Sequence, residues 1–152
     1  MQTYEINRNT QAIIAHQKNN KLGSLVYEKG NKFFVPMTPT EIIKKSCEYF
    51  GSSFEGRQKG TKSLLCISHK VPIVVEELNQ IIFFPTTSPR LEECSWISLS
   101  HIEEYEKSGY DSKVYFKEGE SIELPISIGV LDNQVLRAAR LVFVLRKRKE
   151  KV

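Results

Sequence analysis

Residues 38 to 51 read Thr38-Pro39-Thr40-Glu41-Ile42-Ile43-Lys44-Lys45-Ser46-Cys47-Glu48-Tyr49-Phe50-Gly51, and this stretch contains both the start and the end of a helix. Thr38 is a preferred N-cap residue, proline suits the first helical position, and Glu41 completes a capping box. Gly51 is typical of a residue that ends a helix. We therefore predict a helix over residues 39–49. Helical spacing buries Ile42, Ile43, Cys47 and Phe50 and leaves Lys44, Lys45 and Glu48 in solvent.

Short strands are predicted around this helix. Apolar runs and alternating patterns, bounded by turn residues, predict strands at residues 12–16, 24–28, 32–35, 64–68, 72–75, 81–84, 96–100, 113–116 and 121–124. Hairpin turns are expected at residues 29–31 and at Gly119, and residues 86–90 are expected to form an exposed loop. Phe83 and Phe84 continue an apolar run from Ile81, so we assign them, and likewise Trp96, to the core instead of to base stacking.

A second main helix is predicted over about residues 129–149. Its inward stripe comprises Leu131, Val135, Ala138, Val142 and Leu145, and its opposite face carries Arg137, Arg140, Lys147 and Lys151. Leu141 and Phe143 lie off this stripe, which suggests that the helix also contributes to a dimer interface. The basic run 146–151 is either a phosphate contact or a solvated tail. The predicted fold class is α+β, with mostly short antiparallel strands and two main helices in a single domain over residues 1–152.

A glycine-rich basic segment follows the first helix. Residues 50–62 read Phe50-Gly-Ser-Ser-Phe-Glu-Gly-Arg-Gln-Lys-Gly-Thr-Lys62, and no carboxylate lies between Gly56 and Val75. We interpret residues 50–62 as a loop that contacts phosphate through its backbone and its cations. A nucleotide-binding loop is not supported, because Arg57 and Gln58 stand where that motif requires Lys and Ser or Thr. A nucleic-acid contact and an ordinary solvated connection both remain open.

The charge is polarised along the chain. Residues 1–75 contain eleven Lys and Arg against five Asp and Glu, residues 92–123 contain three against nine, and residues 124–152 contain seven against two. Phosphate binding is therefore expected to use the first half and the last helix. The acidic stretch is expected to face away from DNA or toward a basic partner.

Other chemistries find little support in the sequence. The cysteines, Cys47, Cys66 and Cys94, lack metal or dithiol spacing, so we expect each to be a small buried residue, with no metal and no cofactor. The N-terminus lacks a basic region followed by an apolar run, and no apolar stretch is long enough to span a bilayer. We expect a cytoplasmic protein that does not contact membranes.

Several ordered motifs between residues 33 and 140 together resemble one family. They are Phe50-Gly-Ser-Ser-Phe-Glu-Gly-Arg-Gln-Lys-Gly-Thr61, Ile67-Ser-His-Lys-Val-Pro-Ile73, Asn79-Gln-Ile-Ile-Phe-Phe-Pro-Thr86, Trp96-Ile-Ser98, Glu123-Leu-Pro-Ile-Ser127, and Asn133-Gln-Val135 with Arg137. This set closely resembles the ComK family of competence transcription factors of Gram-positive bacteria. The resemblance is looser before Phe33. Longer members continue beyond the position of Val152 into a tail that is recognised by a proteolytic adaptor, so the resemblance does not extend to that contact.

The resemblance implies a non-enzymatic, nucleoid-associated activator of transcription. Members of the family bind paired A·T-rich boxes in double-stranded DNA, mainly through the minor groove, as dimers that pair into tetramers. An activator also has RNA polymerase as a further expected partner. We expect Arg57 to enter the narrow minor groove. The other candidate DNA contacts are Lys59, Lys62, Lys70, Arg137 and Arg140, with His69, Ser52 and Ser53 as additional donors to phosphate; Ser52 and Ser53 could equally cap the turn after the helix.

The sequence leaves two other classes of function as alternatives. An enzyme that acts on a phosphorylated small molecule would use a basic glycine-rich segment, but no carboxylate pair or metal-ligand spacing accompanies it. A protein-interaction partner that forms mixed oligomers with a longer family member, without activating transcription, is the alternative to an autonomous DNA-binding regulator.

Overall fold

The structure is a computed structural model and describes residues 2–152. Its strands are β1 (Thr10–Lys18), β2 (Lys21–Glu28), β3 (Asn31–Val35), β4 (Ile73–Glu76), β5 (Ile81–Pro85), β6 (Trp96–Ser98), β7 (Ile102–Ser108), β8 (Asp111–Phe116) and β9 (Ser121–Leu124). Its helices are α1 (Pro39–Tyr49), α2 (Phe54–Leu65), the short 3₁₀ helix η1 (Leu99–His101) and α3 (Ile128–Lys149). The predicted α+β class with antiparallel strands is confirmed.

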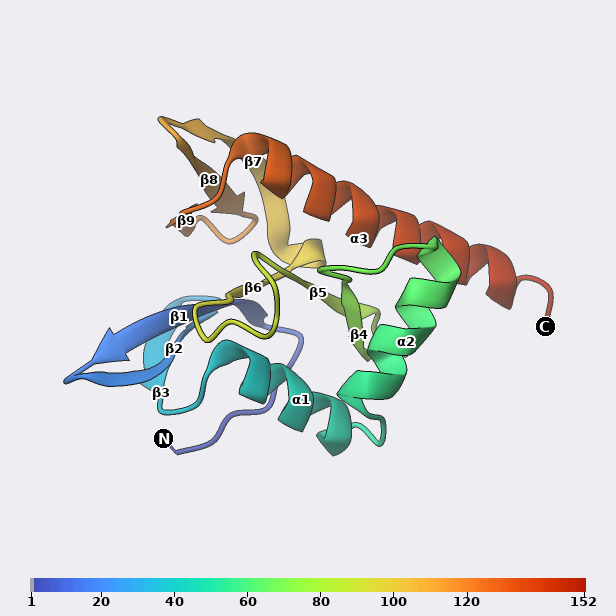
Figure 1. Ribbon diagram of the computed structural model, residues 1–152, viewed down its shortest axis with the longest axis horizontal. Helices are drawn as coiled ribbons and strands as arrows, with labels where there is room; N and C mark the ends of the chain where they lie inside the picture. Colours follow the sequence, from blue (N-terminus) through green and yellow to red (C-terminus); the bar gives the residue numbers. More distant parts are fainter. Residues whose placement is uncertain (1) are drawn as a thin grey trace.

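Two antiparallel sheets organise the molecule. The larger sheet has the order β3-β2-β1-β6-β5-β4, and the smaller sheet has the order β7-β8-β9. The β1-β2-β3 meander is joined to the β4-β5 hairpin through β6, which pairs with both β1 and β5. In Figure 1, α1 lies on one side of the larger sheet, and α3 with the β7-β9 sheet lies on the other.

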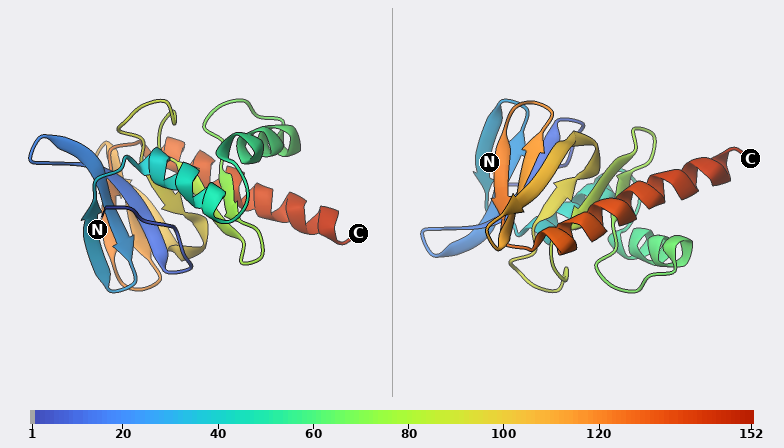
Figure 2. Two further views of the ribbon diagram at one scale, coloured as in Figure 1. Left: turned by 90° about the horizontal axis from the view of Figure 1, so that it is seen from below. Right: turned by 90° about the horizontal axis from the view of Figure 1, so that it is seen from above.

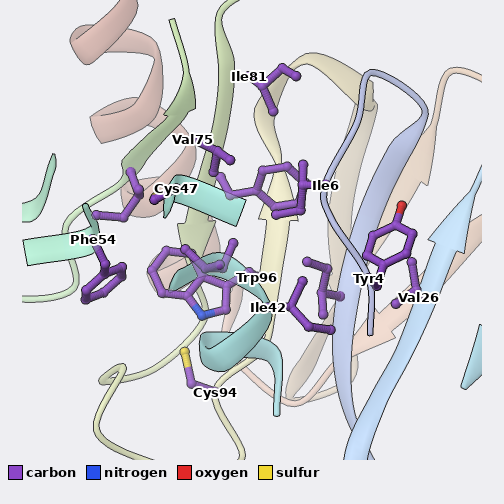
Figure 3. Close-up of a cluster of buried hydrophobic side chains, with 14 of the residues drawn as sticks. Tyr4, Ile6, Val26, Ile42, Cys47, Phe54, Val75, Ile81, Cys94 and Trp96 are labelled. Carbon is purple, nitrogen blue, oxygen red and sulfur yellow. The ribbon is translucent and has the colours of Figure 1, made fainter. Parts of the chain in front are cut away.

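Neighbouring residues of the larger sheet point to opposite faces and belong to two separate hydrophobic cores. Ile13, Phe83 and Trp96 join the cluster beneath α1, whereas their neighbours Phe84 and Ile97 join the cluster beneath α3 and β7-β9. This alternation follows from the two-residue period of a strand. Figure 3 shows the Trp96 indole in the middle of the first cluster, with Phe54 and Ile42 on either side of it. The predicted core positions of Phe83, Phe84 and Trp96 are therefore confirmed, since each is fully buried.

Helix α1 forms as predicted. The Thr38 side chain accepts a hydrogen bond from the Glu41 amide (3.3 Å), and the Glu41 carboxylate accepts one from the Thr38 amide (2.9 Å). Ile42, Ile43 and Cys47 are fully buried. Phe50 is a correction: it is 38% exposed and packs edge-on against Tyr49, because the helix ends and the chain turns at Gly51 (φ +80°).

The predicted glycine-rich loop is largely a helix, which is the main correction to the fold. Ser53 caps α2 by accepting a hydrogen bond from the Gly56 amide (3.0 Å). A Cβ on Gly56 would lie 2.9 Å from the Ser53 hydroxyl, so glycine permits this close cap. Phe54, Thr61 and Leu65 bury one face of α2, and this burial offsets the cost of about 1 kcal/mol that each glycine imposes on a helix.

Other differences are local. Leu64 and Leu65 end α2 instead of beginning a strand, and Cys66 then takes a left-handed conformation (φ +54°). The sequence did not predict β7, because four charged residues interrupt its apolar pattern. Strand β6 stops at Ser98, where η1 begins. In the expected exposed loop Thr86 is buried, and its hydroxyl accepts a hydrogen bond from the Ser95 amide (3.0 Å).

Helix α3 confirms the second predicted helix. Ser127 caps it by accepting a hydrogen bond from the Val130 amide (3.3 Å). Its fully buried positions are Leu131, Gln134, Ala138 and Leu141. Leu141 was expected to lie off the inward stripe, and this prediction is wrong because Leu141 is fully buried. The buried stripe is rotated slightly toward Gln134. The packing therefore buries the Gln134 side chain despite its polar amide. Phe143 is exposed as expected.

Candidate nucleic-acid interface

A cleft of about 710 Å³ opens where α1 and α2 meet two loops. Its lining residues are Thr40 and Lys44 from α1, Phe54, Glu55, Gln58 and Lys62 from α2, Ser68, His69 and Lys70 from the loop after α2, and Ser88, Pro89 and Arg90 from the loop after β5. Four cationic side chains face one carboxylate here. We call this feature the cationic cleft.

The inner wall of the cationic cleft is rigid and apolar. Phe54 is 6% exposed and packs edge-on against Trp96, with ring centroids 6.1 Å apart. The Trp96 indole nitrogen donates to the Thr40 hydroxyl (3.0 Å), which fixes the wall to α1. The Lys44 ammonium lies over the Phe54 ring at 5.4 Å, a cation–π arrangement that holds this charge at the cleft.

The loop that carries His69 and Lys70 is fixed from behind by α3. The Gln134 amide nitrogen donates to the Lys70 carbonyl (2.9 Å) and to the Pro85 carbonyl (2.8 Å). Arg137 donates to the His69 carbonyl (2.8 Å), and Arg140 donates to the Leu65 carbonyl at the end of α2 (3.3 Å). These hydrogen bonds hold the backbone of the loop against α3, and they leave the side chains of His69 and Lys70 free to line the cleft.

The candidate residues fall into separate groups. Lys62, His69 and Lys70 line the cationic cleft together, and Lys59 is exposed one turn before Lys62 on α2. Arg137 and Arg140 do not line the cleft, since they brace its rear. Ser53 caps α2, and Ser52 lies in the turn before it.

Arg57 lies at the contact between α1 and α2. It is half-buried, and its Nε atom is buried without a hydrogen-bond partner. Burial raises the pKa of the nearby Cys47 thiol to about 11, and the positive charge of Arg57 opposes that rise. Arg57 is not among the residues that line the cleft, although it lies on the same helix as Lys59 and Lys62.

Lys44 and Arg90 belong to the cleft but were not among the predicted site residues. Lys44 follows Thr40 by four residues, so both point from the same face of α1. This spacing was visible in the sequence, but nothing there showed that α2 would pack opposite that face. Arg90 is exposed in the loop after β5, and only the folded chain brings it to α1.

A second basic surface lies at the end of α3. Arg146, Lys147, Arg148 and Lys149 occupy the last turn. Three of them have surface partners: Arg146 donates to Gln80 (3.1 Å), Lys147 lies 3.9 Å from Glu150, and Lys149 lies 3.2 Å from Glu77. In Figure 1 this end of α3 lies beside α2, and the acidic β7-β9 sheet lies at the opposite end of the molecule. The basic residues of the N-terminal half do not all share the basic end: Lys29, in the turn after β2, lies 3.6 Å from Glu118, in the turn after β8.

The remaining candidate chemistry is sparse. Cys47 and Cys94 are buried, whereas Cys66 is exposed, so the prediction that all three cysteines are buried is wrong for Cys66. Across residues 2–152, no three His, Cys, Asp or Glu side chains gather in a way that would hold a metal ion. In the same range, no helix combines the length and the apolar character needed to cross a membrane.

Comparison with known proteins identifies the family. The family model described as ComK protein matches residues 1–150. The competence transcription factor of Bacillus subtilis (strain 168) is 42% identical over 142 residues, covering 93% of this chain and 74% of that protein. No solved structure matches the chain. Because the family model spans nearly all of the sequence, the chain belongs to the ComK family.

Proposed function

We propose that this chain is a DNA-binding transcriptional regulator that recognises A·T-rich duplexes. Membership of the ComK family and a relative that is a competence transcription factor support the regulatory role. The observation that carries the DNA-binding part is the cationic cleft, where Lys44, Lys62, Lys70 and Arg90 outnumber the single carboxylate of Glu55. A protein with this role works in the cytoplasm, at the nucleoid, and has RNA polymerase as a second partner.

The proposed contacts are of two kinds. One kind anchors the protein to DNA phosphates, and the other distinguishes A·T-rich from G·C-rich duplexes. Lys44, Lys62 and Lys70 in the cleft, and Lys59 on its outer helix face, anchor phosphates. His69 donates to phosphate as a weaker contact, and Ser52 could do so from the turn before α2. Ser53 supports the contact indirectly, because its hydroxyl is engaged as the cap of α2. These contacts set affinity but carry no sequence information.

Discrimination is assigned to arginine. An A·T-rich minor groove is narrow and strongly negative, so an inserted guanidinium is favoured without base-specific hydrogen bonds. Arg57 has a buried Nε with no partner, a situation that costs about 1–3 kcal/mol. Turning toward DNA would relieve that cost. Arg90, exposed at the cleft, is the second arginine placed to insert.

Arg137 and Arg140 have a positioning role in this proposal. Both donate to carbonyls of the segment behind the cleft, so their loss would displace Lys70 and weaken DNA binding even without a direct phosphate contact. Their remaining N–H groups leave phosphate contacts available to them.

The test is a fluorescence-anisotropy titration with an A·T-box duplex and a G·C-rich duplex. Arg57→Ala or Arg90→Ala should reduce the preference for the A·T duplex. Lys59→Ala should weaken both duplexes equally and lower the salt slope by about one. Lys107→Ala, an exposed change on β7 in the acidic sheet, is the matched control and should bind like the parent. Folded Arg57 and Lys59 variants that bind like the parent would show that neither of these two residues contacts DNA.

A second candidate function is pairing with a longer family member. The observation that favours it is the exposure of Leu136 and Phe143 on α3. Mixing this chain with a longer member should then give mixed dimers that bind DNA less tightly than the longer member alone. Unchanged DNA affinity on mixing would exclude this role.

A further inference from the structure

The β1-β2 hairpin extends beyond the sheet to which it belongs. Strand β3 pairs with β2 only from Ser24 onward, and β6 pairs with β1 only at Ala12 and Ile13. Within the described chain, the backbone of residues 16–18 therefore pairs only with that of residues 21–23. Both views of Figure 2 show this two-stranded segment, in blue, projecting from the body at the end of the molecule opposite the C-terminus. We call residues 16–23 the hairpin arm.

The tip of the hairpin arm has a defined turn. Asn19 (φ +53°) and Asn20 (φ +62°) both have positive φ angles, as in the type I′ turn that matches the twist of a hairpin with a two-residue loop. Asparagine tolerates this conformation better than most residues. Lys18 and Lys21, on either side of the turn, lie directly opposite each other. The turn therefore presents two carboxamides between two ammonium groups.

Phe34 of β3 braces the base of the hairpin arm. Its ring lies so close to Gly23 that a Cβ on this glycine would come within 2.5 Å of it. The His16 ring meets Phe34 edge-on, with centroids 6.1 Å apart, and the Lys18 ammonium lies 5.4 Å from the Phe34 centroid. An isolated two-stranded hairpin is marginally stable in water, so these contacts help to keep the arm extended.

The hairpin arm carries positive charge that the fold does not neutralise. No carboxylate lies between Glu5 and Glu28 in the sequence. Lys18 and Lys21 are exposed, and neither forms an ion pair within residues 2–152. Like charges directly opposite each other destabilise a strand pair. Contact with phosphate would remove this repulsion, which favours a polyanionic partner for the arm.

We propose that the hairpin arm enters the minor groove of an A·T-rich duplex and reads it through Asn19 and Asn20. At A·T pairs the floor of that groove presents only acceptors, adenine N3 and thymine O2, whereas G·C pairs add the 2-amino donor of guanine. The side-chain amides of both asparagines supply N–H donors that match the A·T pattern. Lys18 and Lys21 contact the phosphates that border the groove.

This assignment rests on the proposed DNA binding and adds a reading element to the cationic cleft. The two surfaces are separate, because the residues that line the cleft all follow Val35 in the sequence. The arm is also distant from the acidic contact of Lys29 with Glu118. Eight residues separate Lys21 from Lys29, a span of about 25 Å along an extended strand. Exposed charges are largely screened beyond about 8 Å at physiological salt, so this carboxylate does not repel DNA from the arm.

Duplexes that contain inosine test the groove and the residues together. An inosine–cytosine pair lacks the guanine 2-amino group, so its minor groove resembles that of A·T and its major groove that of G·C. The parent should bind an inosine-box duplex as it binds the A·T-box duplex, and more tightly than the G·C duplex. Asn19→Gly/Asn20→Gly favours the same turn but lacks both amides, and it should reduce this preference by at least about fivefold. Asn31→Gly, at an exposed position in the other hairpin, should keep the preference of the parent.

A lysine pair tests the phosphate contacts. Lys18→Ala/Lys21→Ala should weaken binding to every duplex and lower the salt slope by about two. Lys29→Ala/Lys32→Ala removes the same charge near the opposite end of β2, and it should leave the salt slope unchanged. Thermal unfolding of each variant shows that it is folded.

The outcomes separate the hairpin arm from the function on which it rests. A parent that binds A·T and G·C duplexes equally would overturn both proposals. A parent that prefers A·T, with a folded double-glycine variant that keeps the full preference, would overturn the arm alone. A parent that binds inosine boxes like G·C boxes would place discrimination in the major groove and also overturn the arm, as would an unchanged salt slope in the folded Lys18→Ala/Lys21→Ala variant.

Discussion

Gln134 joins three segments that meet behind the cationic cleft. It is fully buried, it donates to the carbonyls of Lys70 and Pro85, and its own carbonyl accepts a hydrogen bond from Arg137 (3.4 Å). A buried amide is stable only when its donors and acceptors are satisfied. This one residue therefore links α3 to both the loop of the candidate site and the end of β5.

Replacement of Gln134 by leucine should destabilise the fold. The change keeps the volume but leaves the buried Pro85 carbonyl without a donor, which costs about 1–3 kcal/mol. Urea denaturation should show a free energy of unfolding that is lower by about this amount. The neighbouring Asn133→Ala, on an exposed position, should shift it by less than about 0.5 kcal/mol. Equal stability of the two variants would mean that the Gln134 hydrogen bonds contribute little.

Thiol reactivity should distinguish Cys66 from the two buried cysteines. Burial raises the pKa of Cys47 to about 11 and also raises the pKa of Cys94, so both thiols stay protonated near neutral pH. A thiol reagent should therefore modify one cysteine in the native protein and three after denaturation. More than one rapidly modified thiol in the native state would contradict the packing of α1.

The raised pKa of Cys47 also makes stability depend on pH. The unfolded thiol has a pKa of 9.0, and the folded thiol has a pKa of about 11. Below pH 9 the thiol is neutral in both states, and its contribution to the free energy of unfolding is fully present. This contribution is lost as the pH rises from 9 through about 11, because the unfolded thiol ionises before the folded one. Cys47→Ser should reduce the fall in stability across this alkaline window.

At the scale of single elements, α1 and α2 show what sequence could and could not predict. The residues that begin and end α1 act locally. Thr38 and Glu41 cap its start, and Gly51 follows its end, so the sequence alone was enough to predict this helix. The start of α2 is also local, because Ser53 caps it, but Gly56 and Gly60 indicated a loop. What stabilises α2 is the burial of Phe54 and Leu65 in two different cores, and that burial depends on segments far away in sequence.

Gly60→Ala tests whether α2 is a helix in solution. Gly60 lies inside α2, and an added Cβ would meet no atom within 4 Å. Alanine should therefore raise the free energy of unfolding by about 0.5–1 kcal/mol, through its higher helix propensity. If residues 54–65 were instead a loop, the substitution would be neutral or destabilising. Thermal or urea denaturation measures the difference.

At the scale of the whole molecule, the fold converts a charge pattern in sequence into a charge pattern in space. The acidic sheet and the basic end formed by α2 and α3 lie at opposite ends (Figure 1). The acidic balance of residues 92–123 and the basic balance of residues 124–152 indicated this separation, but the basic β1-β3 segment lies beside the acidic sheet. The sequence did not predict the cationic cleft, because Lys44, Lys62, Lys70 and Arg90 come from four segments that only packing brings together. Likewise, Arg137 and Arg140 were recognisable as basic residues, but their role as braces depends on the position of the loop after α2.

In the proposed function, the cationic cleft binds the backbone of A·T-rich DNA. The most direct measurement compares the salt dependence of Kd for the parent, Lys62→Ala/Lys70→Ala and Lys107→Ala on one A·T-box duplex. We expect weaker binding by the double variant and a salt slope smaller by about two, with Lys107→Ala unchanged. A folded double variant with the affinity and salt slope of the parent would contradict the claim.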